Sequence, residues 1–195
     1  LRCFADRGAD IHRPKKCGRT PIYTASFYGH VAVVELLIEK GAMVSAASDA
    51  GLTPLLAACF SGHALVAAVL IDHGADIDVV TRDTGRTPLY AAAQEGHHRV
   101  IELLATRGAN LDKSAEASGV TPLWIAAQNG HWHAVQTLCA HGADLEKGKI
   151  IHTTQMQQLL VAAYNGHLRV LQTLACWGAR IDGGDFGEAL GLERG

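Results

Sequence analysis

Residues 87–109 read TPLYAAAQEGHHRVIELLATRGA, and this stretch decides the fold. Thr87 is of the residue type that caps helix N-termini, and the proline after it sits where a helix needs no backbone N–H. Gly96 stands before a histidine and is suited to the left-handed backbone that ends a helix. Apolar residues then recur at helical spacing over 100–104, and Gly108 closes them. The stretch predicts two short helices in tandem.

The same signals return along the whole chain at a nearly constant spacing. A Gly-Ala pair follows each Gly-His pair after 12 residues, whereas the segment from Gly-Ala to the next threonine position varies from 12 to 15 residues. A unit that fixes its helices and absorbs insertions elsewhere has a rigid body and a tolerant loop, and Asp, Thr and Gly in that loop predict a β-turn or hairpin. Such a period is typical of stacked repeats. The glycines of the Gly-His pairs are Gly29, Gly62, Gly96, Gly130 and Gly166.

Four phrases closely resemble units of the ankyrin repeat family: TPIYTASFYGHVAVVELLIEKGA, TPLLAACFSGHALVAAVLIDHGAD, TPLYAAAQEGHHRVIELLATRGAN and TPLWIAAQNGHWHAVQTLCAHGAD. The resemblance implies an all-α ankyrin-repeat solenoid of about five helix-turn-helix repeats with β-hairpin fingers, plus an N-terminal half repeat. It covers 1–182, and 183–195 read as a tail or the start of a degenerate repeat. The expected units are a partial repeat at 1–12 and repeats at about 13–45, 46–78, 79–112, 113–146 and 147–182.

The chain departs from the family signature in two places. The histidine of the T-P-L-H-x-A signature is replaced in every unit, by Tyr23, Leu56, Tyr90, Trp124 and Leu160. The fifth unit has Gln157 and Gln158 in place of Thr-Pro, so we expect a weaker start to its first helix. Leu1 to Gly8 align with the second helix of a unit. We therefore expect the natural protein to extend further at the N-terminus, and the isolated chain to fray there.

Eleven histidines raise the question of a metal site. Five of them belong to Gly-His pairs and so stand one repeat apart, roughly 10 Å by helix-packing distance. This is too far for a shared zinc ion at Zn–N distances of about 2 Å, and we interpret these histidines as structural. Glu95 beside His97 is the best acid–base cluster, but it falls at a helix end where side chains are solvated. Without a nucleophile elbow, phosphate loop or HExxH motif, the sequence predicts no metal, no cofactor and no enzyme activity.

Composition limits the kinds of partner that the chain is expected to bind and the compartments in which we expect it. The formal net charge of −2 is too weak to indicate nucleic acid as a partner. No apolar run approaches the roughly 18 residues of a membrane span, so we expect no membrane insertion in this segment. The five cysteines are odd in number and form no CxxC pair, which favours reduced thiols in an intracellular protein, cytoplasmic or nuclear, with an organelle left open. We expect the isolated array to be a monomer.

The family resemblance implies that partners contact the finger tips and the last exposed positions of the first helices. The candidate partner-binding residues are Lys16, Arg19, Phe27, Tyr28, Phe60, Arg86, Gln94, Glu95, Gln128, Asn129 and Tyr164. We expect the strongest contacts at Arg19, Phe27, Tyr28 and Phe60, because aromatics and arginine are enriched at binding hot spots. Such a cluster suits an acidic partner segment with an apolar anchor. The alternative is that the two phenylalanines fill gaps between neighbouring units.

The predicted function is that of an interaction scaffold, which binds a protein or peptide through its concave groove and finger tips. Two alternatives stay open on the sequence. The chain could be an architectural segment permanently packed in a larger assembly, or the regulatory repeat region of a larger enzyme or channel. Fold alone does not identify the partner.

Overall fold

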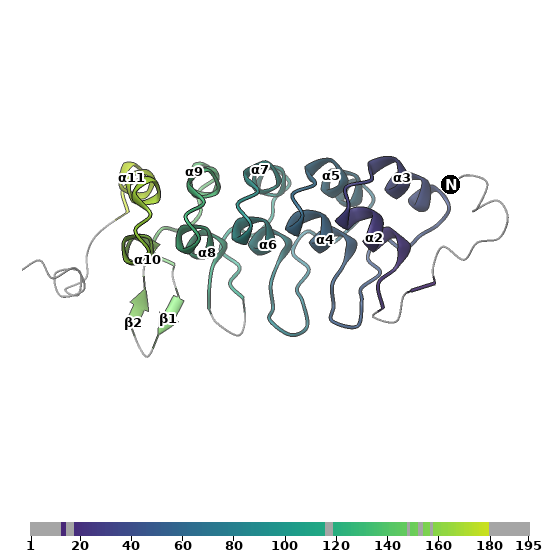
Figure 1. Ribbon diagram of the computed structural model, residues 1–195, viewed down its shortest axis with the longest axis horizontal. Coiled ribbons are helices and arrows are strands. Elements are labelled where there is room, and N and C mark those ends of the chain that lie inside the picture. Colours follow the sequence, from purple (N-terminus) through teal and green to yellow (C-terminus); the bar gives the residue numbers. More distant parts are fainter. Residues whose placement is uncertain are drawn as a thin grey trace, which may run out of the picture.

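The structure is a computed structural model that describes residues 13–14, 18–115, 119–147, 149–151, 154–156 and 158–179. Within them, five helix pairs stand side by side in one row (Figure 1). The first helices, of seven residues each, are α2 (Pro21–Phe27), α4 (Pro54–Phe60), α6 (Pro88–Gln94), α8 (Pro122–Gln128) and α10 (Gln158–Tyr164). The second helices, of nine residues each, are α3 (Val31–Glu39), α5 (Ala64–Asp72), α7 (His98–Thr106), α9 (Trp132–Ala140) and α11 (Leu168–Cys176).

This arrangement confirms the expected all-α solenoid of about five helix-turn-helix repeats. The predicted half repeat at 1–12 and the tail at 183–195 lie outside the described residues, as does the expected fraying at the N-terminus. The exact boundaries between repeats stay a prediction. No helix among the described residues is long and apolar enough to cross a membrane.

Threonine caps begin the first helices of the first four units, as the sequence predicts. In the third unit the Thr87 hydroxyl accepts a hydrogen bond from the Tyr90 backbone N–H at 3.0 Å. The other capping threonines are Thr20, Thr53 and Thr121. In the fifth unit, Gln157 lies outside the described residues, so the weaker helix start stays a prediction. Gln158 is buried, and its side-chain amide donates to the Lys147 carbonyl at 2.7 Å, which ties α10 to its finger.

The histidines of the Gly-His pairs connect neighbouring units. His97 Nε2 lies 3.0 Å from the carbonyl oxygen of Phe60, the last residue of α4 in the preceding unit. Because a carbonyl oxygen only accepts, Nε2 carries the proton at this contact. The contact recurs at 2.9 to 3.1 Å between His63 and Phe27, His131 and Gln94, and His167 and Gln128. These bonds agree with the structural interpretation of the period-spaced histidines.

One continuous apolar core runs through the row of helix pairs. Each second helix contributes a leucine four residues before its closing glycine: Leu37, Leu70, Leu104, Leu138 and Leu174. Alanines on the first helices are buried between neighbouring units, where their small side chains allow close packing. They include Ala58, Ala92, Ala126 and Ala162.

The segments between helix pairs project as fingers below the row of first helices (Figure 1). Within the described residues, regular strands occur only in the fifth finger, where β1 (Lys149–Ile151) pairs antiparallel with β2 (Thr154–Met156). The fourth finger has an isolated bridge between Ala115 and Val120. The third closes through the Thr81 N–H, which donates to the Arg86 carbonyl at 3.1 Å. The expected β-hairpin fingers are therefore mostly hydrogen-bonded turns, because the shorter fingers leave little chain for paired strands.

Candidate partner-binding groove

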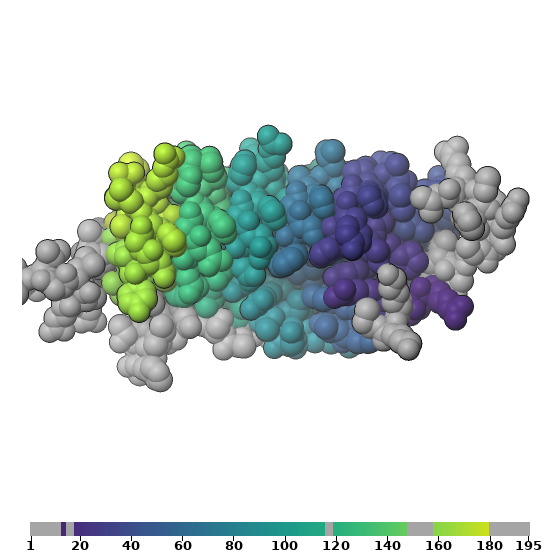
Figure 2. Space-filling view, viewed as in Figure 1, coloured from purple at the N-terminus to yellow at the C-terminus, as the bar shows by residue number. Residues whose placement is uncertain are grey.

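The first three units form a groove of about 280 Å³ between their first helices and their fingers. Figure 2 shows these units as successive bands from purple to teal. The groove, here named the arginine groove, is lined by Arg19, Tyr23, Phe27, Leu52, Leu56, Ala57, Phe60, Thr81, Asp83, Thr84, Arg86, Ala91 and Gln94. Five of the predicted partner-binding residues are thus brought together: Arg19, Phe27, Phe60, Arg86 and Gln94.

Two arginine–tyrosine pairs stand in the first and third units. The guanidinium carbon of Arg19 lies 5.3 Å from the ring centroid of Tyr23, and that of Arg86 lies 5.3 Å from the ring centroid of Tyr90. Both rings are buried, and both arginines are exposed. Burial raises the pKa of Tyr90, and the nearby positive charge of Arg86 opposes that rise. In both units a buried tyrosine ring therefore lies beneath a positively charged side chain.

The sequence carries a signal for these pairs that the single-residue predictions missed. Residues 19–23 read RTPIY and residues 86–90 read RTPLY, so the residue before the capping threonine and the residue three after it are matched in both units. The second unit has Leu52 and Leu56 at these two positions. The tyrosines stand where the family signature has histidine, and this replacement supplies the ring beneath each arginine.

Phe60 offers apolar surface to the groove. Its side chain is 44% exposed, so packing between units leaves part of the ring accessible to a partner. Phe27 is half-buried and meets the Tyr28 ring edge-on, with 5.2 Å between ring centroids. The alternative interpretation, in which these phenylalanines fill gaps between units, therefore describes Phe27 better than Phe60.

Tyr28 lies outside the arginine groove. It is 62% exposed and lines a separate hollow with Arg13, Pro21 and Val33. Arg19 borders both hollows. The four residues expected to make the strongest contacts are therefore split between two surfaces, and the binding role of Tyr28 stays a prediction.

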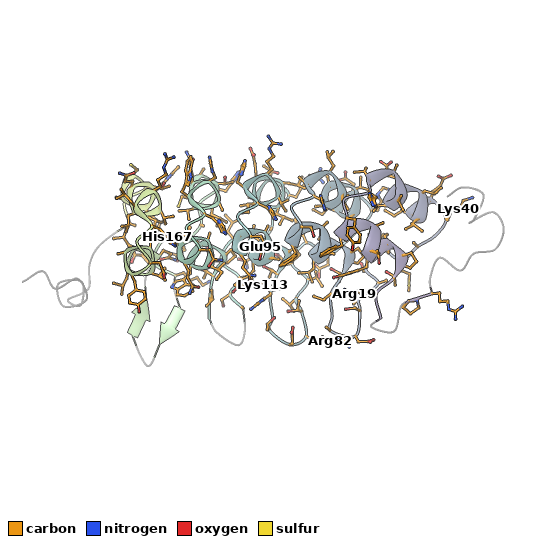
Figure 3. The ribbon with its side chains drawn as sticks, in the orientation of Figure 1. Arg19, Lys40, Arg82, Glu95, Lys113 and His167 are labelled. Carbon is orange, nitrogen blue, oxygen red and sulfur yellow. The ribbon has the colours of Figure 1, made fainter. Side chains whose placement is uncertain are left out.

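The remaining candidate residues are spread along the row. The Gln94 side-chain amide donates to Glu95 Oε1 at 2.9 Å, and Glu95 is exposed at the end of α6 (Figure 3). The Asn129 amide donates to the Gln94 carbonyl at 2.9 Å, so this side chain connects two units. Gln128 is half-buried, and Tyr164 is 80% exposed in the fifth unit. Lys16 lies outside the described residues.

Among the described residues, no group of three or more His, Cys, Asp or Glu side chains is placed to hold a metal ion. The described cysteines differ widely in environment. Cys59 is fully buried, and burial raises the pKa of its thiol far above the usual range. Burial also raises the pKa of Cys139 to about 11, whereas Cys176 is exposed. Cys3 and Cys17 lie outside the described residues.

We expect iodoacetamide at about pH 8 to alkylate Cys176 quickly and to leave Cys59 unmodified in the folded chain. Only an accessible thiolate is a good nucleophile, and Cys59 has neither access nor charge. Peptide mass spectrometry after short exposure measures both sites, and the same reaction in urea is the control in which both should react. Equal labelling of Cys59 and Cys176 without urea would contradict the packing described here.

Comparisons with known proteins agree with the class that the fold defines, a solenoid of short helix pairs. A family model described as ankyrin repeats (3 copies) matches four overlapping segments, residues 1–81, 45–115, 78–149 and 113–185. Because these matches together span most of the sequence, the chain belongs to the ankyrin repeat family.

Solved structures lead to the same fold. The chain is similar to the human ASB11 ankyrin repeat domain, with 27% sequence identity and a TM-score of 0.83 over 94% of this chain and 80% of that one. Matches extend to 525 chains of solved structures, so the fold by itself selects no partner. A comparison with curated proteins finds no matching relative.

Proposed function

We propose that this chain is a scaffold that binds a protein or peptide in the arginine groove. Ankyrin repeats are generally protein-interaction modules and are typically non-catalytic. The observation that carries the proposal is that side chains from three successive units converge on one groove. They combine an exposed aromatic, Phe60, with the exposed guanidinium groups of Arg19 and Arg86. These are the residue types that most often carry binding energy at protein interfaces.

A comparison of two exposed apolar residues tests the proposal. Phe60→Ser is expected to weaken partner binding more than tenfold, because truncating an aromatic anchor typically costs about 2 kcal/mol or more. Leu65→Ser is the matched control, since Leu65 is 73% exposed and lies on α5, outside the groove. Quantitative mass spectrometry of proteins captured by the wild-type chain and by each variant provides the measurement.

The two variants should fold alike, because neither side chain belongs to the buried core. Far-UV circular dichroism and the urea unfolding midpoint check this condition. A captured protein that is lost with Phe60→Ser and kept with Leu65→Ser is the expected result. If every captured protein is retained equally by both variants, the partner binds elsewhere on the array.

A further inference from the structure

The arginine groove carries an ordered pattern of charge. The residue before the capping threonine is Arg19 in the first unit, Leu52 in the second and Arg86 in the third, and all three side chains line the groove. The fourth unit has Val120 at this position, and it is buried. At this position, going from unit to unit, the lining is therefore positive, apolar and positive again.

Both arginines are held in place before any partner arrives. Each guanidinium carbon lies over a buried tyrosine ring, 5.3 Å from its centroid, within the range of a cation–π attraction. The N–H donors lie along the edge of the guanidinium plane and stay available to an acceptor. Neither arginine forms an ion pair with a carboxylate in the part of the chain that the structure describes. An arginine fixed in this way loses little conformational entropy on binding.

The groove also holds one negative charge, whereas a third arginine nearby lies outside it. Asp83 lines the groove, and hydrogen bonds within its own finger, first from the backbone and also from the Thr84 hydroxyl at 3.2 Å, lower the pKa of its carboxyl, so this side chain is negatively charged. Arg82 belongs to the same finger and lines a different hollow, where it packs against Gly51 of the neighbouring finger. Figure 3 shows Arg19 close to the first helices and Arg82 further down the fingers. The lining of the groove therefore carries two positive charges, from Arg19 and Arg86, and one negative charge, from Asp83.

The spacing of the two arginines limits the length of the segment that joins them. Neighbouring units pack at a helix-to-helix distance of roughly 10 Å, so positions two units apart are separated by roughly 20 Å. An extended peptide advances about 3.3 Å per residue and covers this distance in about six residues. Phe60 and Leu52 lie in the second unit, between the two charges.

We infer that the partner segment is an extended acidic peptide with carboxylates about six residues apart and an aromatic or aliphatic side chain between them. This inference rests on the proposed function of the groove. The two carboxylates pair with Arg19 and Arg86, and the apolar side chain packs on Phe60. Carboxylate pairing with arginine in a planar, two-bond arrangement gives the groove its preference for acidic sequences.

Selection of binding peptides tests this inference. A phage-displayed library of random peptides about twelve residues long, enough to span the groove when extended, is selected on the whole chain. We expect the enriched sequences to carry Asp or Glu at two positions about six residues apart, with an apolar residue between them. Fluorescence polarisation of the most enriched synthetic peptide then gives its affinity for the wild-type chain and for each variant.

Three variants separate the arginines of the groove from positive charge in general. Arg19→Gln and Arg86→Gln are each expected to weaken binding about tenfold, as the loss of a charge-assisted hydrogen bond does. Arg82→Gln is the control and should change the affinity by less than about twofold. Added salt should weaken binding to the wild-type chain strongly, and it should weaken binding to a fourth variant, the double substitution Arg19→Gln/Arg86→Gln, only slightly.

The outcomes distinguish this inference from the proposed function. The inference is overturned if the selected peptides bind more weakly to Phe60→Ser but lack acidic residues. It is also overturned if they bind more weakly to Phe60→Ser but keep their affinity for both arginine variants. In either case the groove remains the binding surface. Peptides that bind equally to the wild-type chain, Phe60→Ser and both arginine variants overturn the groove itself. Circular dichroism of every variant confirms that the comparison is between folded chains.

Discussion

Gly62→Ala is expected to lower the free energy of unfolding by about 3 kcal/mol, whereas Gly74→Ala should lower it by only about 1 kcal/mol. Both glycines have left-handed backbones, with φ of +79° and +86°. A side chain pays a similar conformational cost at either site. At Gly62, however, a Cβ atom would lie 2.7 Å from the His97 ring, and nothing lies within 4 Å of a Cβ at Gly74. The ring cannot move aside without losing its hydrogen bond to Phe60.

Urea unfolding followed by circular dichroism measures both losses. A double variant identifies the cause, because His97→Ala removes the ring that a Cβ at position 62 would meet. We expect the loss in Gly62→Ala/His97→Ala to be smaller than the sum of the two single losses, since the two residues are in contact. Equal losses from Gly62→Ala and Gly74→Ala would mean that the contact between units contributes nothing beyond backbone strain.

Local signals in the sequence predict the helices of this fold, because the interactions that begin and end each helix lie within a few residues of it. The hydroxyl of Thr87 caps α6 from within the same unit, and Gly96 ends that helix through its own backbone. The hydrogen bonds between units join residues that are more than 30 positions apart, and the repeat pattern does not indicate them. The histidines recur with the repeat, but the carbonyl that each one binds becomes visible only when the units are stacked.

The candidate site was harder to predict than the helices, because it depends on contacts between units. Position within a unit indicates that Phe27 and Tyr28 both end a first helix, but it does not indicate which neighbour each one faces. Stacking places Phe27 in the arginine groove and Tyr28 in a separate hollow. The length of the fingers is more informative. The fifth finger lies within the longest step between Gly-Ala and the threonine position, and it alone among the described fingers has paired strands.

Truncation of a buried leucine at the centre of the row is expected to cause a second large loss of stability. Leu104→Ala is expected to lower the free energy of unfolding by about 3 to 4 kcal/mol, within the range measured for buried leucines. Leu104 is 0% exposed on α7, which packs against both α5 and α9. Neighbours on both sides leave the surroundings little freedom to collapse into the cavity. The loss should spread through the array, because each unit is stabilised largely by its interfaces with the next.

Leu65→Ala is the matched control for this substitution, with the same change of side chain at an exposed position on the neighbouring second helix. It should alter the free energy of unfolding by less than about 0.5 kcal/mol. Urea unfolding of both variants, analysed with a common slope, gives the two values. A loss below about 1 kcal/mol for Leu104→Ala would mean that the third unit is packed loosely enough to refill the cavity. The continuous apolar core would then be packed incorrectly at its centre, where neighbours on both sides should make it most rigid.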